Sequence, residues 1–373
     1  MEEGFMRVAL VAPPFIPVPP RLYGGTELFV AQLADGLKKL GIDVVVYGNG
    51  ESTVQVEKCW LYARSEWPIT SEIYASLKDI NHTAWAVQDA AQSCDIVHLN
   101  NLPGLVHSRF VALPFVCTVH HPHEAGLSEF YNFYPNVHYV TISDFQRNGE
   151  TMPQVRTIHH GIDLSQYRLY SRKQPYVSFL GRIAPTKGTH LAIQVAKQTG
   201  IPLKIAGEVQ PLYRDYFEKV IKPELDGQFI EYIGEADLGT KNELLGNSMA
   251  MLFPIQWNEP FGLVMIEAMA CGTPVLALPG GSVAEVVKNG VSGWVGSSVT
   301  ELDARVKTLD RDFTPAKVRD YVRRYFSLDR MVRDYANCYC EILDQTLKTP
   351  DLRIVRRETE AELCWPQRPE RAG

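Results

Sequence analysis

Short apolar runs rich in valine, isoleucine and leucine alternate with longer amphipathic stretches along most of the chain. This alternation is typical of a parallel β-sheet whose faces are covered by helices. Residues 7–12 (RVALVA) predict the first strand, and a proline-rich turn leads through a Tyr-Gly-Gly-Thr-Glu stretch at 23–27 into a helix that Gly41 ends. The apolar face of that helix contains Leu28, Phe29, Ala31, Leu33, Leu37 and Leu40. Further strands are predicted at 43–47, 95–99, 115–119, 138–142 and 155–158.

A second series of apolar runs begins near residue 176. It predicts strands at 176–180, 203–206, 230–233, 249–253 and 274–277. A polar, charge-mixed segment at 169–175 (LYSRKQP) separates the two series. Because 373 residues are many for one α/β core, we predict one domain at 1–170 and another at 171–328. Ligands of open α/β sheets bind at the carboxyl ends of the strands, so we expect the site in a cleft between the domains.

The C-terminal part of the chain follows neither series. Residues 329–347 are amphipathic and predict a helix, whose simplest place is against the second domain. Its apolar side contains Met331, Tyr335, Cys338, Ile342 and Leu343. Residues 348–373 are rich in Arg, Glu and Pro and predict a poorly ordered polar tail.

The charge distribution narrows the classes of partner. Residues 1–170 hold 11 Lys and Arg against 17 Asp and Glu, so the net charge of −6 lies there, while the remainder holds 26 of each. Such a chain lacks the basic patch of a nucleic-acid binder, and its acidic half disfavours docking on anionic lipid. No apolar run approaches the roughly 18 residues of a membrane span. We expect no nucleic-acid partner and no membrane association.

Cysteine usage and the N-terminus bear on localisation. The seven cysteines are scattered without CxxC pairs, which favours reduced thiols over a disulfide framework. Residues 1–5 contain two acids and no apolar core, unlike a secretory signal. Together these features predict a cytoplasmic protein.

The most informative segment is 253–274, FPIQWNEPFGLVMIEAMACGTP, which passes from a strand end into an apolar helix. A helix that begins near Pro260 loses no hydrogen bond to the proline. The free N–H groups of Phe261, Gly262 and Leu263 would then leave the positive end of the helix, which suits a diphosphate or a sugar oxygen.

Two carboxylates lie within the same segment. Glu259 and Glu267 are eight residues apart, so a helix that starts near Pro260 would place both roughly along one side. Glu267 stands between Ile266 and Ala268. It is either a solvated helix glutamate or a partly buried carboxylate that the paired hydroxyls of a ribose would satisfy.

The stretch EPFGLVMIEAMACGTPV, followed by GGSVAEVVKNGVSGWV, closely resembles the signature of glycosyltransferase family 4. The resemblance extends from about residue 7 to 345 through the glycine loop at 23–27, TVH at 118–120, HHGID from 159, GRIAPTKG at 181–188 and AGE at 206–208. Two positions depart from the family pattern: His160 stands where asparagine is usual, and Ala284 replaces a proline. These departures concern the fine tuning of donor or acceptor binding.

The resemblance implies a fold and a chemistry. Family 4 enzymes are retaining transferases that use nucleotide-sugars without a metal. They have the α/β fold called GT-B, in which two Rossmann-like doubly wound domains face each other across a cleft. The resemblance also implies that the helix at 329–347 crosses back to pack on the first domain.

Carried over residue by residue, the resemblance assigns roles. Glu259 would bond hydroxyls of the donor sugar and face the reacting carbon, and Glu267 would hold the ribose hydroxyls. Arg182 and Lys187 would hold the diphosphate, and His120 would lie near an outer hydroxyl of the sugar. Glu259, His120, Arg182 and Lys187 are therefore the predicted catalytic residues. The other predicted donor-binding residues are Gly24, Gly25, Gly207, Ile233, Phe261, Gly262 and Leu263, with the base recognised by backbone near Ile233.

Two segments could hold a metal. The histidines of HHPHE at 120–124 have a spacing that zinc ligands can adopt, but no matching cysteine or acid accompanies them. Asp310-Arg311-Asp312 has the DxD form of metal-dependent transferases, within a charged stretch typical of a solvated helix face. We predict no metal and no cofactor, with the nucleotide-sugar as substrate.

The sequence thus predicts a retaining hexosyltransferase that uses a UDP- or GDP-linked sugar and a metal-independent same-face mechanism. Aromatic residues gather at 60–85 and 130–134, where they either stack on an acceptor or pack internally. The expected acceptor is the hydroxyl of a sugar or a small soluble aglycone. The alternatives are a nucleotide-sugar phosphorylase, epimerase or hydrolase on the same fold, and a non-catalytic nucleotide-sugar binding module.

Overall fold

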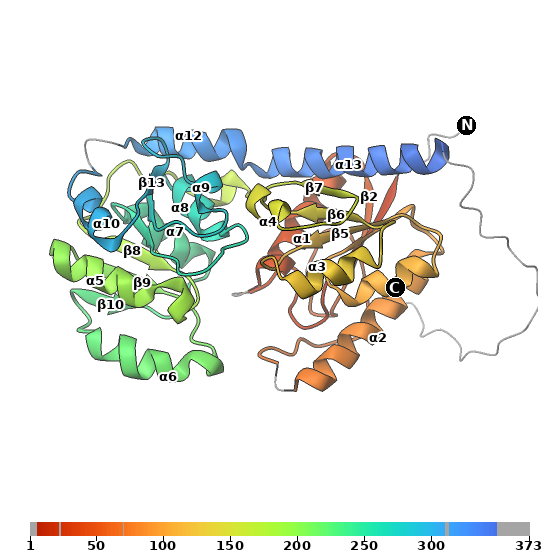
Figure 1. Ribbon diagram of the computed structural model, residues 1–373, viewed down its shortest axis with the longest axis horizontal. Coiled ribbons are helices and arrows are strands. Elements are labelled where there is room, and N and C mark those ends of the chain that lie inside the picture. Colours follow the sequence, from red (N-terminus) through yellow and green to blue (C-terminus); the bar gives the residue numbers. More distant parts are fainter. Residues whose placement is uncertain (1–5, 22–23, 70, 310–312, 349–373) are drawn as a thin grey trace, which may run out of the picture.

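The two predicted series of strands form two separate parallel sheets in a computed structural model, which describes residues 6–21, 24–69, 71–309 and 313–348 (Figure 1). The first sheet has the order β3-β2-β1-β4-β5-β6-β7. Its strands are β1 (Arg7–Val11), β2 (Asp43–Gly48), β3 (Glu57–Trp60), β4 (Ile96–Leu99), β5 (Phe115–Val119), β6 (His138–Thr141) and β7 (Val155–Thr157). The predicted α/β class with two Rossmann-like sheets is confirmed.

The second sheet has the order β10-β9-β8-β11-β12-β13. Its strands are β8 (Val177–Leu180), β9 (Leu203–Ala206), β10 (Ile230–Tyr232), β11 (Met251–Phe253), β12 (Val275–Ala277) and β13 (Gly293–Val295). The sequence pattern missed β3 and β13. β3 is a partly exposed edge strand with little apolar signal, and β13 has only three residues, one of them glycine.

Helices cover both faces of each sheet, so the central strands β5 and β8 are buried along their whole length. In the first domain these are α1 (Gly25–Lys39), α2 (Glu72–Ala90), α3 (Ala125–Asn132) and α4 (Asp144–Asn148). In the second they are α5 (Thr189–Thr199), α6 (Arg214–Tyr216), α7 (Leu238–Asn247), α8 (Leu263–Ala270), α9 (Val283–Val286), α10 (Val299–Val306) and α12 (Pro315–Tyr325). None of the helices within the described ranges combines the length and apolar character needed to cross a membrane.

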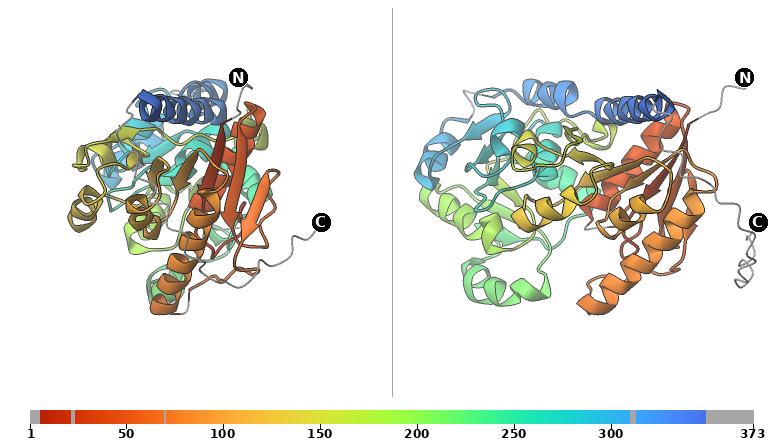
Figure 2. Two further views of the ribbon diagram at one scale, coloured as in Figure 1. Left: turned by 90° about the vertical axis from the view of Figure 1, so that its right-hand side faces the viewer. Right: turned by 45° about the vertical axis from the view of Figure 1, so that its right-hand side comes forward.

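The last helix, α13 (Leu328–Lys348), runs along the top of the first domain, end to end with α12 on the second (Figures 1 and 2). Its residues Met331, Tyr335 and Ile342 share one core cluster with Phe29 and Leu33 of α1. The two helices approach closely at Gly36, where a Cβ atom would lie 2.3 Å from Val332. The C-terminal helix therefore completes the core of the N-terminal domain.

The strand order reverses between β1 and β4 in the first sheet and between β8 and β11 in the second. Reversals of this kind open a crevice at the carboxyl ends of the strands. The glycine loop before α1, the segment after β5 and the segments after β8 and β11 all lie at these ends. The fold thus brings the four motif-bearing loops toward one region.

Candidate active site

A cleft of about 470 Å³ lies between the two domains and is lined by both. The first domain and its connection to the second contribute Gly25, Thr26, His120, His121, Pro122, Ile142 and His160. The second contributes Arg182, Lys187, Gly207, Glu208, Glu235, Lys241, Trp257 and the run 259–264, among others. Most of the residues predicted to bind the donor therefore line one cavity.

Three predicted site residues lie outside the cleft lining. Gly24 is the residue just before α1, and Ile233 follows β10, where its N–H bonds to the carbonyl of Ile205. Glu267 is buried in α8, with 2% of its surface exposed. The remaining members of the predicted set line the cleft: Gly25, His120, Arg182, Lys187, Gly207, Glu259, Phe261, Gly262 and Leu263.

Glu259 and Lys187 form an ion pair inside the cleft. The Lys187 ammonium donates to Glu259 Oε2 at 2.5 Å, and the Trp257 indole N–H donates to the same oxygen at 2.9 Å. The ammonium also lies 4.5 Å from the centre of the Trp257 ring, within cation–π range. Burial lowers the pKa of Lys187, while Glu259 opposes that shift. Trp257 orients both charges and was missed as a site residue in the sequence.

Arg182 lies two residues after the end of β8 and brings a second cation to the cleft. Its Nη1 donates to Gln210 Oε1 at 3.2 Å, and its buried Nε has no hydrogen-bond partner in the described structure. A guanidinium with unused donors suits a phosphate oxygen.

The helix after the EPFG motif begins later than the sequence predicts. α8 starts at Leu263, with Gly262 before it in the left-handed region at φ 78°, which glycine adopts without strain. The prediction that the helix begins near Pro260 is therefore wrong, and Phe261 lies before the first residue of the helix. Leu263 and Val264, the first two residues of the helix, both line the cleft, and their N–H groups have no intrahelical partner.

Glu259 and Glu267 consequently do not share one side of a helix. Glu267 Oε1 accepts from the Tyr167 hydroxyl at 2.8 Å and from the Lys241 ammonium at 3.0 Å. Its Oε2 is buried and has no hydrogen-bond partner among the described residues. Of the two interpretations left open, the partly buried carboxylate is confirmed, because only 2% of Glu267 is exposed.

His120 lies after β5, where its Nε2 bonds to Asn100 Oδ1 at 2.9 Å. Burial lowers the pKa of His120 to about 3, so the ring is neutral at physiological pH. Phe29 of α1 contacts the ring at a centroid distance of 5.1 Å. A neutral imidazole that donates from Nε2 retains an acceptor at Nδ1.

A buried network links this region to α13. His98 of β4 bonds through Nδ1 to the Tyr339 hydroxyl and through Nε2 to Thr118 Oγ1, both at 2.7 Å. Thr118 Oγ1 also bonds to the Tyr335 hydroxyl at 2.9 Å. Burial lowers the pKa of His98 to about 3. The crossing helix is thereby fixed to the strand that leads into His120.

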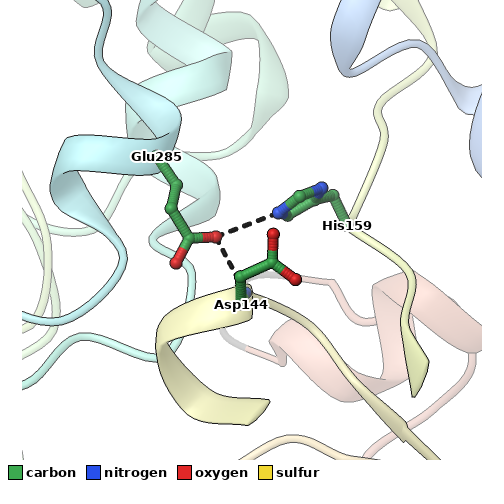
Figure 3. Close-up of side chains that lie close together, drawn as sticks. All are labelled: Asp144, His159 and Glu285. Carbon is green, nitrogen blue, oxygen red and sulfur yellow. Dashed lines mark hydrogen bonds and ion pairs between the residues drawn. The ribbon is translucent and has the colours of Figure 1, made fainter. Parts of the chain in front are cut away.

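A carboxylate joins the two domains beside the cleft (Figure 3). Glu285 of α9 accepts from the backbone N–H groups of Asp144 and Phe145 at the start of α4, at 2.9 and 2.5 Å. Glu285 Oε2 also lies 3.0 Å from Nε2 of His159. Glu285 thus connects the second domain both to the first and to the segment between them.

Metal-ligand geometry occurs once within the described residues, at Asp144, His159 and Glu285. Both oxygens of Glu285 already accept backbone N–H groups there, and Oε2 also bonds to His159, so these contacts are explained by hydrogen bonding between the domains. The histidines at 120–124, which the sequence left as one possible metal-binding segment, do not converge, since His121 bonds to Tyr131 and His123 pairs with Glu150. The DxD sequence at Asp310–Asp312 lies outside the described residues.

Comparison with known proteins identifies the family. Residues 23–166 match the family described as Glycosyltransferase Family 4, and residues 166–321 match the family described as Glycosyl transferases group 1. This chain belongs to glycosyltransferase family 4.

The family 4 chain is 28% identical over 249 residues to the protein YtcC of Bacillus subtilis. That match covers 55% of this chain and 60% of YtcC, less than two thirds of that relative's length. Sucrose-phosphate synthase from Thermosynechococcus elongatus superimposes with a TM-score of 0.76 at 18% identity, over 91% of this chain and all of that one. Anabaena HepE, solved in complex with UDP and glucose, gives 0.70 at 18% identity, over 90% and 100% of the chains. These two structures establish that the family 4 chain shares their GT-B fold.

Several residues around the cleft of this glycosyltransferase escaped the sequence analysis. Trp257, Lys241 and Tyr167 contact the predicted carboxylates from positions that no motif marks. Trp257 stands two residues before Glu259 and could have been noticed as the only aromatic side chain between β11 and that residue. Tyr167 lies 100 residues from its partner, so only the tertiary structure brings them together.

Proposed function

We propose that this protein transfers a hexose from a UDP- or GDP-linked donor to a hydroxyl acceptor, with retention of configuration and without a metal. The observation that carries the proposal is the contact between Lys187 and Glu259 in the interdomain cleft. A cation suited to a diphosphate and a carboxylate suited to sugar hydroxyls lie side by side, as the two halves of a nucleotide-sugar require.

The diphosphate would lie between Arg182, Lys187 and the N-terminal end of α8. The two side chains supply positive charge, and the N–H groups of Leu263 and Val264 supply donors at a positive helix end. Charge of this kind stabilises the leaving nucleoside diphosphate as its bond to the sugar breaks.

The nucleoside would lie toward Glu267. Its Oε2 is buried without a partner in the described structure, while Tyr167 and Lys241 hold Oε1. A buried carboxylate oxygen gains most from a neutral hydroxyl donor, and a ribose offers two. The backbone near Ile233 would then meet the base.

In the transfer step, the bond between the anomeric carbon and the phosphate oxygen breaks as the acceptor oxygen attacks from the same face. The acceptor proton passes to the departing phosphate oxygen. Arg182 and Lys187 stabilise the developing negative charge, and the neutral ring of His120, whose Nε2 donates to Asn100, accepts a hydrogen bond at Nδ1 from an outer hydroxyl of the sugar. No covalent sugar–protein intermediate is required.

The acceptor would enter from the first domain, beside Gly25, Thr26 and Pro122. The excess of acidic over basic residues in 1–170 favours an uncharged sugar or small aglycone over an anionic lipid surface. Strong, salt-sensitive binding to anionic vesicles would contradict this part of the proposal.

The test is a panel of UDP- and GDP-linked hexoses, scored first by thermal shift with and without EDTA and then by nucleotide release with candidate acceptors. We expect one donor to stabilise the protein equally with EDTA, and nucleotide release to depend on the acceptor. Release without an acceptor would indicate a hydrolase, and release that depends on inorganic phosphate would indicate a phosphorylase.

A variant separates an enzyme from a binding module. Glu259→Ala should abolish acceptor-dependent release while part of the donor-induced thermal shift remains. Donor stabilisation of the wild-type protein without turnover on any acceptor would favour a non-catalytic module.

A further inference from the structure

Two consecutive histidines between the domains make different polar contacts. His159 bonds to Glu285 of the second domain, whereas His160 lines the cleft and contacts the first. Only 5% of His160 is exposed. It follows β7 in the segment that leads from the first sheet to the second, so it occupies the border of the two halves of the site.

The His160 ring stacks on His120. The two imidazoles lie 5.8 Å apart between centroids and are inclined by only 11°. Phe29 contacts both of them at 5.1 Å, and Phe261 meets His160 edge-on at 5.1 Å and 85°. His160 is thus the ring that touches both His120 of the first domain and the EPFG loop of the second.

The backbone of His160 is held independently of any substrate. The Arg330 guanidinium of α13 donates to the carbonyls of His159 and His160, at 2.5 and 3.0 Å. At Gly161 a Cβ atom would lie 2.3 Å from the carbonyl oxygen of Ser327, so the chain there is pressed against the start of α13. A β-bridge between Ile162 and Ser327 follows directly.

His120, in contrast, has weak support of its own. One hydrogen bond, from Nε2 to Asn100, fixes a direction but leaves the ring free to turn about it. The stack with His160 and the edge contact with Phe29 define the plane of the ring. Because those contacts come from two sides, they determine where the free Nδ1 of His120 points.

We propose that His160 is a positioning residue, whose stacked ring fixes the orientation of the His120 imidazole toward the sugar. This inference rests on the proposed function, in which His120 meets an outer hydroxyl of the donor sugar. The contribution of His160 is made by the shape of its ring, so a phenyl ring should replace it.

The test compares three substitutions in steady-state transfer assays. Changing His160→Ala should lower kcat about 10- to 100-fold with the donor KM within about 3-fold, because misorientation costs turnover rather than binding. His160→Asn, which is polar but has no ring, should lose as much. His160→Phe should keep kcat within about 3-fold of wild type. His138→Asn, at the start of strand β6 and outside the cleft lining, is the control and should be unchanged.

A second readout does not depend on activity. In NMR spectra of protein with labelled histidine, nuclear Overhauser effects between the His120 ring signals, assigned with a His120→Asn variant, and the Phe29 ring should weaken in His160→Ala and persist in His160→Phe. If no donor turns over but the signals behave in this way, the proposed function fails while the positioning role stands. Full activity of His160→Ala, or activity in His160→Asn but not in His160→Phe, would overturn the inference. If His160→Ala has a much lower melting temperature than wild type, the activities of His160→Phe and His160→Asn are compared instead.

Discussion

The Lys187 ammonium and the Glu259 carboxylate lie 2.5 Å apart, beneath the Trp257 ring and inside the cleft between the domains. In the proposed function Lys187 binds the diphosphate of the donor and Glu259 binds hydroxyls of its sugar. Donor binding would therefore weaken or replace the direct contact between the two side chains. Both side chains are largely buried, with 14% and 9% exposed, and neither charge is well hydrated without the other. Loss of one partner would therefore leave the other charge buried and unpaired, which affects stability as well as the proposed catalysis.

Single and double substitutions separate these two contributions. Lys187→Met or Glu259→Gln should each lower the free energy of unfolding by about 1–3 kcal/mol, because the remaining group loses its partner. The double variant should recover part of that loss in urea denaturation but remain inactive in nucleotide release. Recovered activity in the double variant would show that the pair serves only the fold.

Glu267 is expected to govern donor affinity. Removing its carboxylate in Glu267→Ala deletes the proposed acceptor for the ribose, and we expect the nucleoside diphosphate to bind about 10- to 100-fold more weakly by calorimetry. Glu243 offers a control, because it also accepts from a tyrosine, Tyr170, at 2.7 Å, but it is exposed whereas Glu267 is buried. Equal weakening in Glu243→Ala would refute a specific role for Glu267.

Glu285 should control the contact between the domains. Glu285→Ala removes three hydrogen-bonded contacts across the border, so the distribution of interdomain distances should broaden. Small-angle scattering would detect a larger radius of gyration, and the donor KM should rise because the cleft spends less time closed. An unchanged scattering profile would mean that the covering helix α13 alone sets the arrangement.

The buried histidines give stability a predictable dependence on pH. The folded pKa of His98 is lowered to about 3, against an ordinary value of 6.5, so the unfolded chain binds a proton that the folded protein does not. The stability this group contributes is complete above about pH 6.5 and is lost as the pH falls toward 3.

Comparing wild type with His98→Asn isolates that group. The free energy of unfolding should fall between about pH 6 and 4 with a slope about 1.4 kcal/mol per pH unit steeper in wild type than in the variant. Parallel slopes from urea titrations at several pH values would contradict the assignment of His98 as a buried neutral ring.

The close packing of α1 against α13 can be tested by adding a single methyl group at Gly36. Gly36→Ala places a methyl group against Val332 and should cost about 1–3 kcal/mol of stability, despite the better helix propensity of alanine. Gly126 of α3 faces open space, so Gly126→Ala should be neutral or slightly stabilising. Thermal melting of both variants provides the comparison.

The sequence predicted the fold well because buried parallel strands leave continuous apolar runs. The edge strand β3 and the three-residue strand β13 carry no such run, so they were missed. The start of α8 was misplaced by three residues because proline permits a helix start but does not require one, and the left-handed Gly262 delays it.

For the site, the motifs identified residues whose side chains face the cleft, including Glu259, Arg182 and His120. They could not identify Tyr167 or Lys241, because contacts between distant segments leave no local pattern. The stack of His160 on His120 could not be predicted for the same reason, because the two residues are 40 positions apart in the chain and meet only in the folded protein.

The return of α13 over the first domain separates the order of synthesis from the order of folding. Phe29, Leu33 and Leu37 leave the ribosome early, yet the side chains that cover them, such as Met331 and Tyr335, are made only after the entire second domain. During that interval the N-terminal half carries an uncovered apolar stripe, which is a target for chaperones and a risk for aggregation. The second domain, whose strands and covering helices are consecutive in the chain, can mature first. The N-terminal half, although it is translated first, is therefore the last to become native.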